Sequence, residues 1–263
     1  MGELLFVGLG LGGVQDMSVR ALAELKSCDA VFAEFYTSKL ADAELGELEN
    51  FIGKRIKLLD RVDVEEGEEL LKEAKRGKVA FLSAGDTMAA TTHVDLRLQA
   101  LDLGIPTKLI HGISIFTACA TSLGLQPYKF GRTITLPFPE KGFQPTSPYE
   151  HMLENKKLGL HSLVLLDIKA DQKRYMSANE GIQWLLDAED RVGGGLLDAK
   201  AVVCAACRVG SSTELLASGY PQTLLAQDLG PPLHTLVVPG KLHFMEAEAL
   251  VKLAGAPEEI LEE

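Results

Sequence analysis

The chain has 263 residues, of which 46% are hydrophobic and 24% are charged, a composition typical of globular proteins. Its formal net charge of −11 argues against binding to nucleic acids or anionic membranes, because both require a basic face. No apolar run reaches the roughly 18 residues that span a bilayer. The apolar stretch at the N-terminus follows no basic segment, so we expect a cytoplasmic protein without a secretory signal.

The first half of the chain alternates between apolar runs and segments with helical spacing. Alternation of this kind predicts a parallel sheet flanked by helices. Strands are expected at 3–10, 29–36, 54–60, 78–85 and 106–112. Helices are expected at 16–28, 38–52, 63–76, 93–104 and 114–124.

The second half changes character at residues 137–148, which carry four prolines and no periodicity. We interpret this segment as a long loop, and long loops inside compact domains are usually functional. Beyond it, strands are expected at 161–170, 198–210 and 234–243, with helices at 177–189 and 244–254. The sequence as a whole therefore predicts the α/β class.

Cys204 and Cys207 form a C-x-x-C pair, which could indicate a redox or metal site. Zinc would need two more ligands, and no second cysteine pair or paired histidine lies nearby. A thioredoxin-like pair would begin a helix, whereas this pair lies in a strand-like run, on which residues three apart point to opposite faces. We therefore expect reduced, half-buried thiols and no metal site.

The turn after the first strand matches G-x-G-x-x-G through Gly8, Gly10 and Gly13, and Glu34 ends the next strand. This is the pattern of a dinucleotide-binding turn, so an NAD-dependent oxidoreductase is one alternative. However, small residues also follow the strands at 78–85 and 106–112. A pyrophosphate needs only the first such turn, so the pattern alone is weak.

Several long motifs occur in an order that is specific to one family. They are FVGLGL (6–11), FAEFYTS (32–38), GDTMAATTH (85–93), YKFG (128–131), LDIKA (166–170), YMSANE (175–180) and VPGKLHFMEAE (238–248). Together they resemble the diphthine synthases, a family of class III, tetrapyrrole-methylase-like methyltransferases, in its compact archaeal form. The resemblance runs from about residue 3 to the C-terminal AGAPEEIL and covers practically the whole chain.

The resemblance implies two α/β domains, with S-adenosylmethionine bound in the cleft between them. It places the proline-rich loop inside the second domain, so we expect domains at 1–112 and 113–263. It also implies a homodimer. Members of the family methylate the amino group of a histidine on translation elongation factor 2 that already carries a 3-amino-3-carboxypropyl group. Archaeal-type members add three methyl groups, which gives diphthine in the second step of diphthamide synthesis.

The family's cofactor contacts fall on eight positions of this chain: Leu11, Asp86, Ala89, Ser114, Ile115, Leu166, Val209 and His234. The carboxylate of Asp86 can accept hydrogen bonds from ribose hydroxyls or an ammonium group, and the small Ala89 leaves room for nearby main chain. Ile115, Leu166 and Val209 can pack on adenine, while main-chain groups beside them read its edge.

Each candidate also has a structural interpretation that the sequence leaves open. The apolar ones could be core residues, Asp86 could shape a turn, Ser114 could cap a helix, and His234 could be a structural histidine. One departure from the family stands out: Gly-Asp-Pro is usual where this chain has Gly85-Asp86-Thr87. Because proline fixes φ, we expect Thr87 to leave the turn softer and to weaken cofactor binding.

The sequence identifies no general base, so the catalytic residues stay unknown. The trimethylated product is a quaternary ammonium, which aromatic faces accommodate well. Tyr128 and Phe130 are our candidates for an aromatic cage, with ordinary packing as the alternative. Besides the oxidoreductase, two other functions remain as alternatives. One is a class III methyltransferase acting on a tetrapyrrole precursor, and the other is a non-catalytic module that binds the translation factor.

Overall fold

The computed structural model describes residues 2–140, 142 and 144–262. Contacts within the chain divide it into two compact units. The first contains the chain up to Ile115, together with Lys169–Lys173 and Gly210–Ser212, and the second contains the remainder. The sequence prediction of domains at 1–112 and 113–263 did not include these two short segments, because a linear pattern does not reveal which distant residues a loop contacts.

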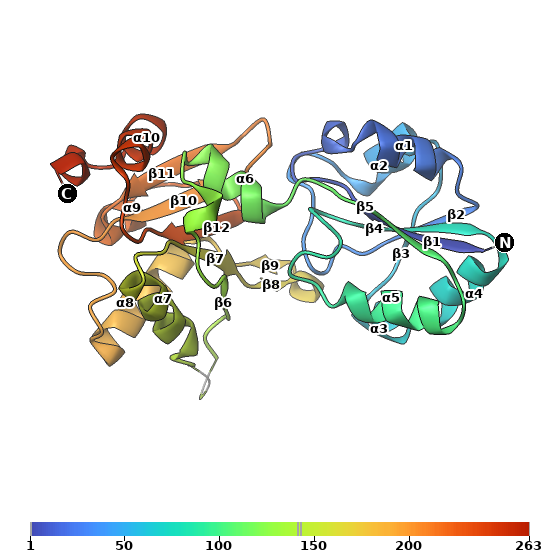
Figure 1. Ribbon diagram of the computed structural model, residues 1–263, viewed down its shortest axis with the longest axis horizontal. Coiled ribbons are helices and arrows are strands. Elements are labelled where there is room, and N and C mark those ends of the chain that lie inside the picture. Colours follow the sequence, from blue (N-terminus) through green and yellow to red (C-terminus); the bar gives the residue numbers. More distant parts are fainter. Residues whose placement is uncertain (1, 141, 143, 263) are drawn as a thin grey trace. The chain divides into compact units, whose positions relative to one another are not determined.

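The first unit is built on a parallel sheet of order β3-β2-β4-β1-β5 (Figure 1). Its strands are β1 (Glu3–Gly8), β2 (Ala30–Ala33), β3 (Lys57–Leu58), β4 (Lys78–Ser83) and β5 (Thr107–Ile110). Its helices are α1 (Val19–Lys26), α2 (Leu45–Ile52), α3 (Arg61–Glu66), α4 (Glu68–Arg76) and α5 (His93–Asp102). The predicted parallel, helix-flanked sheet is therefore correct for this unit.

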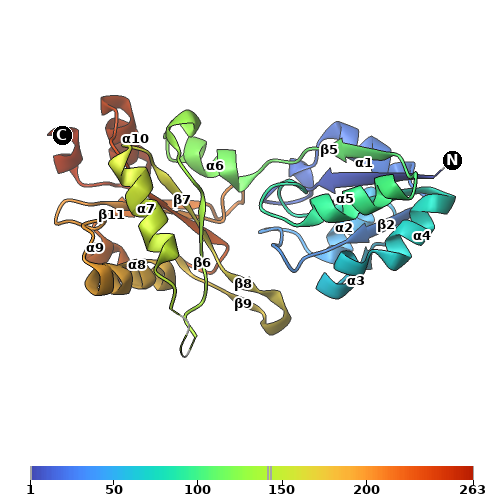
Figure 2. The same ribbon diagram turned by 60° about the horizontal axis from the view of Figure 1, so that its bottom comes forward.

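Side chains alternate across this sheet and so create two apolar layers. Leu5 and Val7 of β1 pack on the side of α1 and α2, whereas Leu4 and Phe6 pack on the side of α3, α4 and α5. Figure 1 shows the two groups of helices on opposite faces, and Figure 2 brings the second group forward. Both faces of the strand are buried, which explains why its sequence reads as a continuous apolar run.

Three predicted elements of the first unit differ most from the structure. The helix expected at 38–52 begins only at Leu45. The helix expected at 63–76 is two helices, because Gly67 has a φ of 66°, in the left-handed region, and ends α3 before α4 begins. The strand expected at 54–60 is reduced to the two residues of β3.

The second unit contains a mixed sheet of order β11-β10-β12-β7-β6, in which only β6 and β7 pair in parallel. Its strands are β6 (Ile134–Leu136), β7 (Ser162–Leu166), β10 (Val203–Cys207), β11 (Leu215–Gly219) and β12 (His234–Val238). Its helices are α6 (Ile115–Ser122), whose first residue belongs to the first unit, α7 (Ser147–Lys157), α8 (Ala178–Val192), α9 (Pro221–Leu225) and α10 (Phe244–Ala254). A two-stranded ribbon joins β8 (Ile168–Lys169) to β9 (Arg174–Tyr175).

The core of the second unit lies between one face of its sheet and the helices α7, α8 and α9 (Figure 2). Val203, Ala205 and Cys207 of β10 point into this core. The sequence prediction missed β6, β11 and α7, and the antiparallel pairing was also unforeseen. The strand expected at 198–210 is confined to β10. No helix in the described part of the chain is both long and apolar enough to cross a bilayer.

Candidate functional site

Three strand ends meet at the carboxyl edge of the first sheet, and glycine allows them to approach. A Cβ placed on Gly8 would lie 2.5 Å from the carbonyl oxygen of Gly85 and 2.6 Å from the nitrogen of Gly112. Gly10 and Gly85 also exchange main-chain hydrogen bonds of 3.2 and 2.7 Å. The small-residue turns that follow β1, β4 and β5 are therefore neighbours, at the edge where open α/β sheets usually bind ligands.

The turn after β1 is occupied by a carboxylate of the protein itself. Oδ2 of Asp16 accepts hydrogen bonds from the main-chain nitrogens of Leu11, at 3.0 Å, and Gly12, at 2.7 Å. A dinucleotide-binding turn offers such N–H groups to a pyrophosphate. Here they are already satisfied, and a second anion beside Asp16 would be repelled.

Glu34 likewise does not fit the role of a ribose ligand. It is buried, and its carboxylate accepts hydrogen bonds from the nitrogens of Tyr36 and Thr37 and from Oγ1 of Thr37. In addition, β1 lies between β4 and β5 rather than beside β2. The dinucleotide-binding interpretation of Gly8, Gly10 and Gly13 is therefore not favoured.

The turn after β4 presents Asp86 with both carboxylate oxygens engaged. Oδ1 accepts a hydrogen bond of 3.0 Å from the nitrogen of Met88, and Oδ2 lies 2.8 Å from Nδ1 of His111. The main-chain oxygen of Asp86 accepts from the nitrogen of Ala89 at 3.1 Å, which closes the turn. Asp86 thus shapes the turn and also contacts a histidine from the end of β5, on the other side of β1, which the sequence did not indicate.

Thr87 is held by hydrogen bonds where the family usually has proline. Its main-chain oxygen accepts from Oγ1 of Thr91 at 2.7 Å and lies 2.9 Å from Nδ1 of His93. His93 is buried, and burial lowers its pKa, against the opposing effect of Glu34, whose Oε1 lies 3.6 Å from Nε2. These contacts restrain the loop and oppose the softness expected from the loss of proline.

The remaining candidates of the first unit lie on the same turns. Leu11 is half-buried on the turn after β1. Ser114 and Ile115 are half-buried at the start of α6, shortly after the end of β5. The first unit therefore places Leu11, Asp86, Ala89, Ser114 and Ile115 on the turns that follow β1, β4 and β5.

The candidates of the second unit meet at one edge of its own sheet. Leu166 ends β7, Val209 follows β10, and His234 begins β12. Because β12 runs antiparallel to both neighbours, its first residue lies beside their last ones: His234 pairs with Cys207, and the register with β7 places it opposite Leu166. The sequence alone does not reveal this grouping, because Leu166 and His234 are 68 residues apart in the chain.

The side chain of His234 is committed to its own unit. Its Nδ1 accepts a hydrogen bond of 2.9 Å from the nitrogen of Ala178, at the start of α8. Burial, together with the positive charge of Arg208, lowers the pKa of His234 to about 4. The imidazole is therefore neutral at ordinary pH, and the structural role that the sequence left open for His234 is correct for its side chain.

The two cage candidates have different surroundings. The side chain of Phe130 packs edge-on against His161, with ring centroids 5.2 Å apart. Tyr128 is 81% exposed and lies on a short 3-10 helix, Pro127–Lys129, that immediately precedes Phe130. The aromatic cage stays a prediction.

The four cysteines are free thiols among the described residues. All four are buried. Cys204 and Cys207 are buried rather than half-buried as expected, because β10 is a central strand whose five residues are all buried. Burial raises the pKa of Cys204 to about 12 and that of Cys207 to about 11, which keeps both thiols protonated. No group of three or more metal-binding side chains occurs among residues 2–140, 142 and 144–262.

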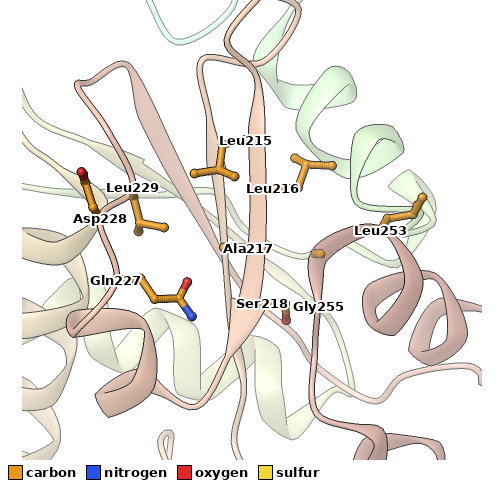
Figure 3. Close-up of a pocket in the computed structure, with 10 residues that line it drawn as sticks. Leu215, Leu216, Ala217, Ser218, Gln227, Asp228, Leu229, Leu253 and Gly255 are labelled. Carbon is orange, nitrogen blue, oxygen red and sulfur yellow. The ribbon is translucent and has the colours of Figure 1, made fainter.

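A separate pocket of about 540 Å³ lies in the second unit, beside the edge strand β11 (Figure 3). Leu215 and Leu216 line one side, Gln227 and Leu229 line another, and Leu253 of α10 approaches from a third. None of the eight cofactor candidates lines it. It is therefore distinct from both groups of candidates.

Comparison with known proteins agrees with these features. The family model of the tetrapyrrole (corrin/porphyrin) methylases matches residues 3–208. A diphthine synthase of Methanosarcina mazei is 48% identical over 98% of each chain, and one of Methanothermobacter thermautotrophicus is 44% identical over 98% of each. A crystal structure of a diphthine synthase superimposes with a TM-score of 0.89, at 35% identity and 98% coverage of both chains.

The chain belongs to the tetrapyrrole methylase family, and the two α/β units have the fold of that family. Within it, the chain belongs to the diphthine synthases, whose reaction is an S-adenosylmethionine-dependent methylation in diphthamide biosynthesis. The family resemblance, the fold class and the enzyme class predicted from the sequence are thus confirmed. The oxidoreductase and tetrapyrrole alternatives are not favoured.

Proposed function

We propose that this chain transfers three methyl groups to the amino group of the 3-amino-3-carboxypropyl-histidine of translation elongation factor 2, which gives diphthine. The observation that carries the proposal is the position of Asp86, on a turn packed against two other small-residue turns. The neighbouring glycine-rich turn is closed to a pyrophosphate by Asp16. The edge of the sheet thus suits a ligand with hydroxyl and ammonium groups better than a dinucleotide.

Eight residues would hold the cofactor: Leu11, Asp86, Ala89, Ser114, Ile115, Leu166, Val209 and His234. S-adenosylmethionine supplies an activated methyl group on a sulfonium centre. Asp86 retains lone pairs after its contacts with Met88 and His111, since each carboxylate oxygen can accept two hydrogen bonds. Because the side chain of His234 is engaged, its contact would come from the main chain.

The protein's part in the reaction is chiefly orientation. The amine must lie in line with the methyl group, and orientation of this kind can supply about 7–11 kcal/mol of a barrier. Tyr128 and Phe130 would receive the product, since a quaternary ammonium is attracted to aromatic faces. The exposure of Tyr128 leaves its ring open to a protein substrate.

We also propose a cytoplasmic homodimer whose two domains are residues 1–112 and 113–263. No metal, nucleic acid or membrane takes part in this proposal. Exposed apolar side chains on α10, namely Phe244, Met245 and Leu253, support association with a second copy. Sedimentation equilibrium tests this part: a protein that stays monomeric at micromolar concentration would contradict the dimer.

Calorimetric titration with S-adenosylhomocysteine, with NAD in a parallel titration, tests the cofactor assignment. The account predicts that the first binds and the second does not. The variant Asp86→Ala should weaken binding about tenfold or more, because hydrogen bonds to a charged group contribute about 1.5–3 kcal/mol. Binding of NAD alone would contradict the assignment.

A further inference from the structure

His111 and Asp86 form a pair in which the carboxylate is sheltered and the imidazole is open. Oδ2 of Asp86 lies 2.8 Å from Nδ1 of His111, and the two side chains are 12% and 72% exposed, respectively. An ionised carboxylate can only accept hydrogen bonds, so Nδ1 carries the proton and Nε2 holds the lone pair of the neutral ring. A carboxylate that fixes one tautomer in this way prepares a histidine for proton transfer.

Among the described residues on the turns after β1, β4 and β5, the titratable side chains other than His111 are carboxylates. The turns after β1, β4 and β5 bring Asp16, Asp86 and His111 to this edge. Asp16 is engaged by the nitrogens of Leu11 and Gly12. On the adjoining elements, Glu34 and His93 are buried and bonded to their own loops. His111 is therefore the open imidazole among the described titratable groups on these turns.

The proposed reaction requires a proton acceptor that the sequence did not supply. The amine reacts only when neutral, and each of the first two transfers leaves an ammonium that must lose a proton before the next. A single methylation would need one deprotonation, whereas the full series needs three. Water is a weak base near neutral pH, so a side chain that accepts the proton and then exchanges it with solvent is suited to this task.

We propose that His111 accepts the proton of the substrate ammonium before each methyl transfer, and that Asp86 orients it. The inference rests on the proposed function. The N–H bond of the ammonium breaks, its electron pair stays on the amine, and the proton forms a bond with Nε2. The imidazolium, stabilised by Asp86, then returns the proton to water through its exposed side, so the next cycle begins with a neutral ring.

The test compares the wild-type chain with His111→Gln and with a matched control, His151→Gln. His151 also lies beside a carboxylate, with Nδ1 3.2 Å from Oε2 of Glu154, but on α7 of the second unit. Each protein is mixed with S-adenosylmethionine and an elongation factor carrying the 3-amino-3-carboxypropyl-histidine. The rate of each methylation is followed by mass spectrometry between about pH 5.5 and 9, which brackets the titration of an ordinary histidine. Calorimetry with S-adenosylhomocysteine is run on the same samples.

We expect His111→Gln to slow methylation about 100-fold near pH 7, a typical contribution of a general base. The defect should shrink at high pH, where the amine loses its proton unaided, and monomethyl and dimethyl species should accumulate. Binding of S-adenosylhomocysteine and the behaviour of His151→Gln should match the wild type. Added imidazole should partly restore the rate of His111→Ala.

Two results would overturn the role of His111. One is a His111→Gln enzyme with the wild-type pH profile. The other is a variant whose defect lies wholly in cofactor affinity, which would make His111 a support of the Asp86 turn. A wild-type protein that neither binds S-adenosylhomocysteine nor methylates the factor would refute the proposed function itself, and the role of His111 with it.

Discussion

Oδ2 of Asp16 lies 2.7 Å from the main-chain nitrogen of Gly12, and the same atom accepts a hydrogen bond from Leu11. A single carboxylate thus fills the position that a phosphate would take in a dinucleotide-binding turn. This relationship explains why the literal G-x-G-x-x-G pattern of this chain does not offer its N–H groups to a phosphate.

Removing this carboxylate should loosen the turn without creating a dinucleotide site. We expect Asp16→Ala to lower the free energy of unfolding by about 2–3 kcal/mol, because hydrogen bonds to a charged group are lost. Asp16→Asn keeps an acceptor oxygen and should lose less. Urea denaturation gives the stabilities, and titration with NAD gives the specificity. An Asp16→Ala protein that bound NAD would show that Asp16 alone excludes it.

Replacing Thr87 by the family's usual proline should tighten the cofactor turn. Thr87 contributes its main-chain oxygen to Thr91 and His93, and proline retains that oxygen. A proline that fits the native φ stabilises a fold by about 0.4–1 kcal/mol, so Thr87→Pro should increase affinity for S-adenosylhomocysteine up to about fivefold. Calorimetry measures the change. A loss of affinity would mean that the turn here differs from that of the family.

A methyl group added to α8 should disturb Leu166, one of the cofactor candidates. A Cβ on Gly181 would lie 2.8 Å from Cδ2 of Leu166 and 2.9 Å from Cδ1 of Leu236. Because these are the ends of flexible side chains, we expect Gly181→Ala to fold but to bind S-adenosylhomocysteine more weakly. Gly46→Ala is the matched control, since nothing lies within 4 Å of its added Cβ.

The control should leave binding unchanged and gain up to about 1 kcal/mol of stability from helix propensity. Equal affinities in the two variants would remove Leu166 from the cofactor site.

Shortening Tyr128 should affect the later methylations only. The side chain is 81% exposed, so Tyr128→Ala should leave the free energy of unfolding within about 0.5 kcal/mol of wild type. If Tyr128 receives the growing cation, partly methylated product should accumulate at every pH, unlike the pH-dependent defect expected for His111→Gln. Mass spectrometry of the elongation factor at several pH values distinguishes a defect at Tyr128 from one at His111. Normal progress to three methyl groups would refute the cage.

Acidification should destabilise the second unit through His234. Its folded-state pKa of about 4 lies below the ordinary value of about 6.5, so the unfolded chain binds the proton first. The stabilisation is fully present above about pH 6.5 and is lost as the pH falls towards 4, by about 3 kcal/mol in total.

Glu24 of the first unit responds at lower pH. Hydrogen bonds from Lys108 and Lys78 lower the pKa of Glu24 to about 2, so its contribution to stability is lost in a separate window, below about pH 4.5.

Urea denaturation at several pH values checks this prediction. His234→Asn should flatten the upper window, since an amide oxygen can still accept from Ala178, whereas His151→Asn should leave it unchanged. An unaltered pH dependence in His234→Asn would assign the effect to His93 and His161, whose pKa values burial also lowers.

The first unit was predictable because its signals are local. Apolar strands buried on both faces, with small residues at their ends, define a parallel sheet, and the turns after β1, β4 and β5 follow from it. The second sheet was not predictable from the sequence, because its pairing is mostly antiparallel and partly joins strands that are distant in the chain. Leu215–Gly219 forms β11 through pairing with β10. The stretch shows no alternation of apolar and polar residues that would predict a strand.

The candidate site shows the same division. Asp86 and Ala89 stand out from the sequence because a carboxylate and small residues follow a strand. His111, the partner of Asp86, does not stand out from the sequence. It lies 25 residues away in the chain, and the two residues meet only because their turns are adjacent in the fold. Asp16 is the first residue of the helix expected at 16–28, whereas its carboxylate accepts hydrogen bonds from Leu11 and Gly12 of the preceding loop. Such contacts depend on side-chain direction, which a residue pattern does not record.

The most direct test of the account is the mass of the modified histidine peptide after elongation factor 2 is incubated with this chain and S-adenosylmethionine. The account predicts a gain of three methyl groups on the amino group of the 3-amino-3-carboxypropyl side chain, and a slower gain with Asp86→Ala when S-adenosylmethionine is held below saturation. An unmodified peptide, from a protein that binds S-adenosylhomocysteine, would contradict the proposed substrate.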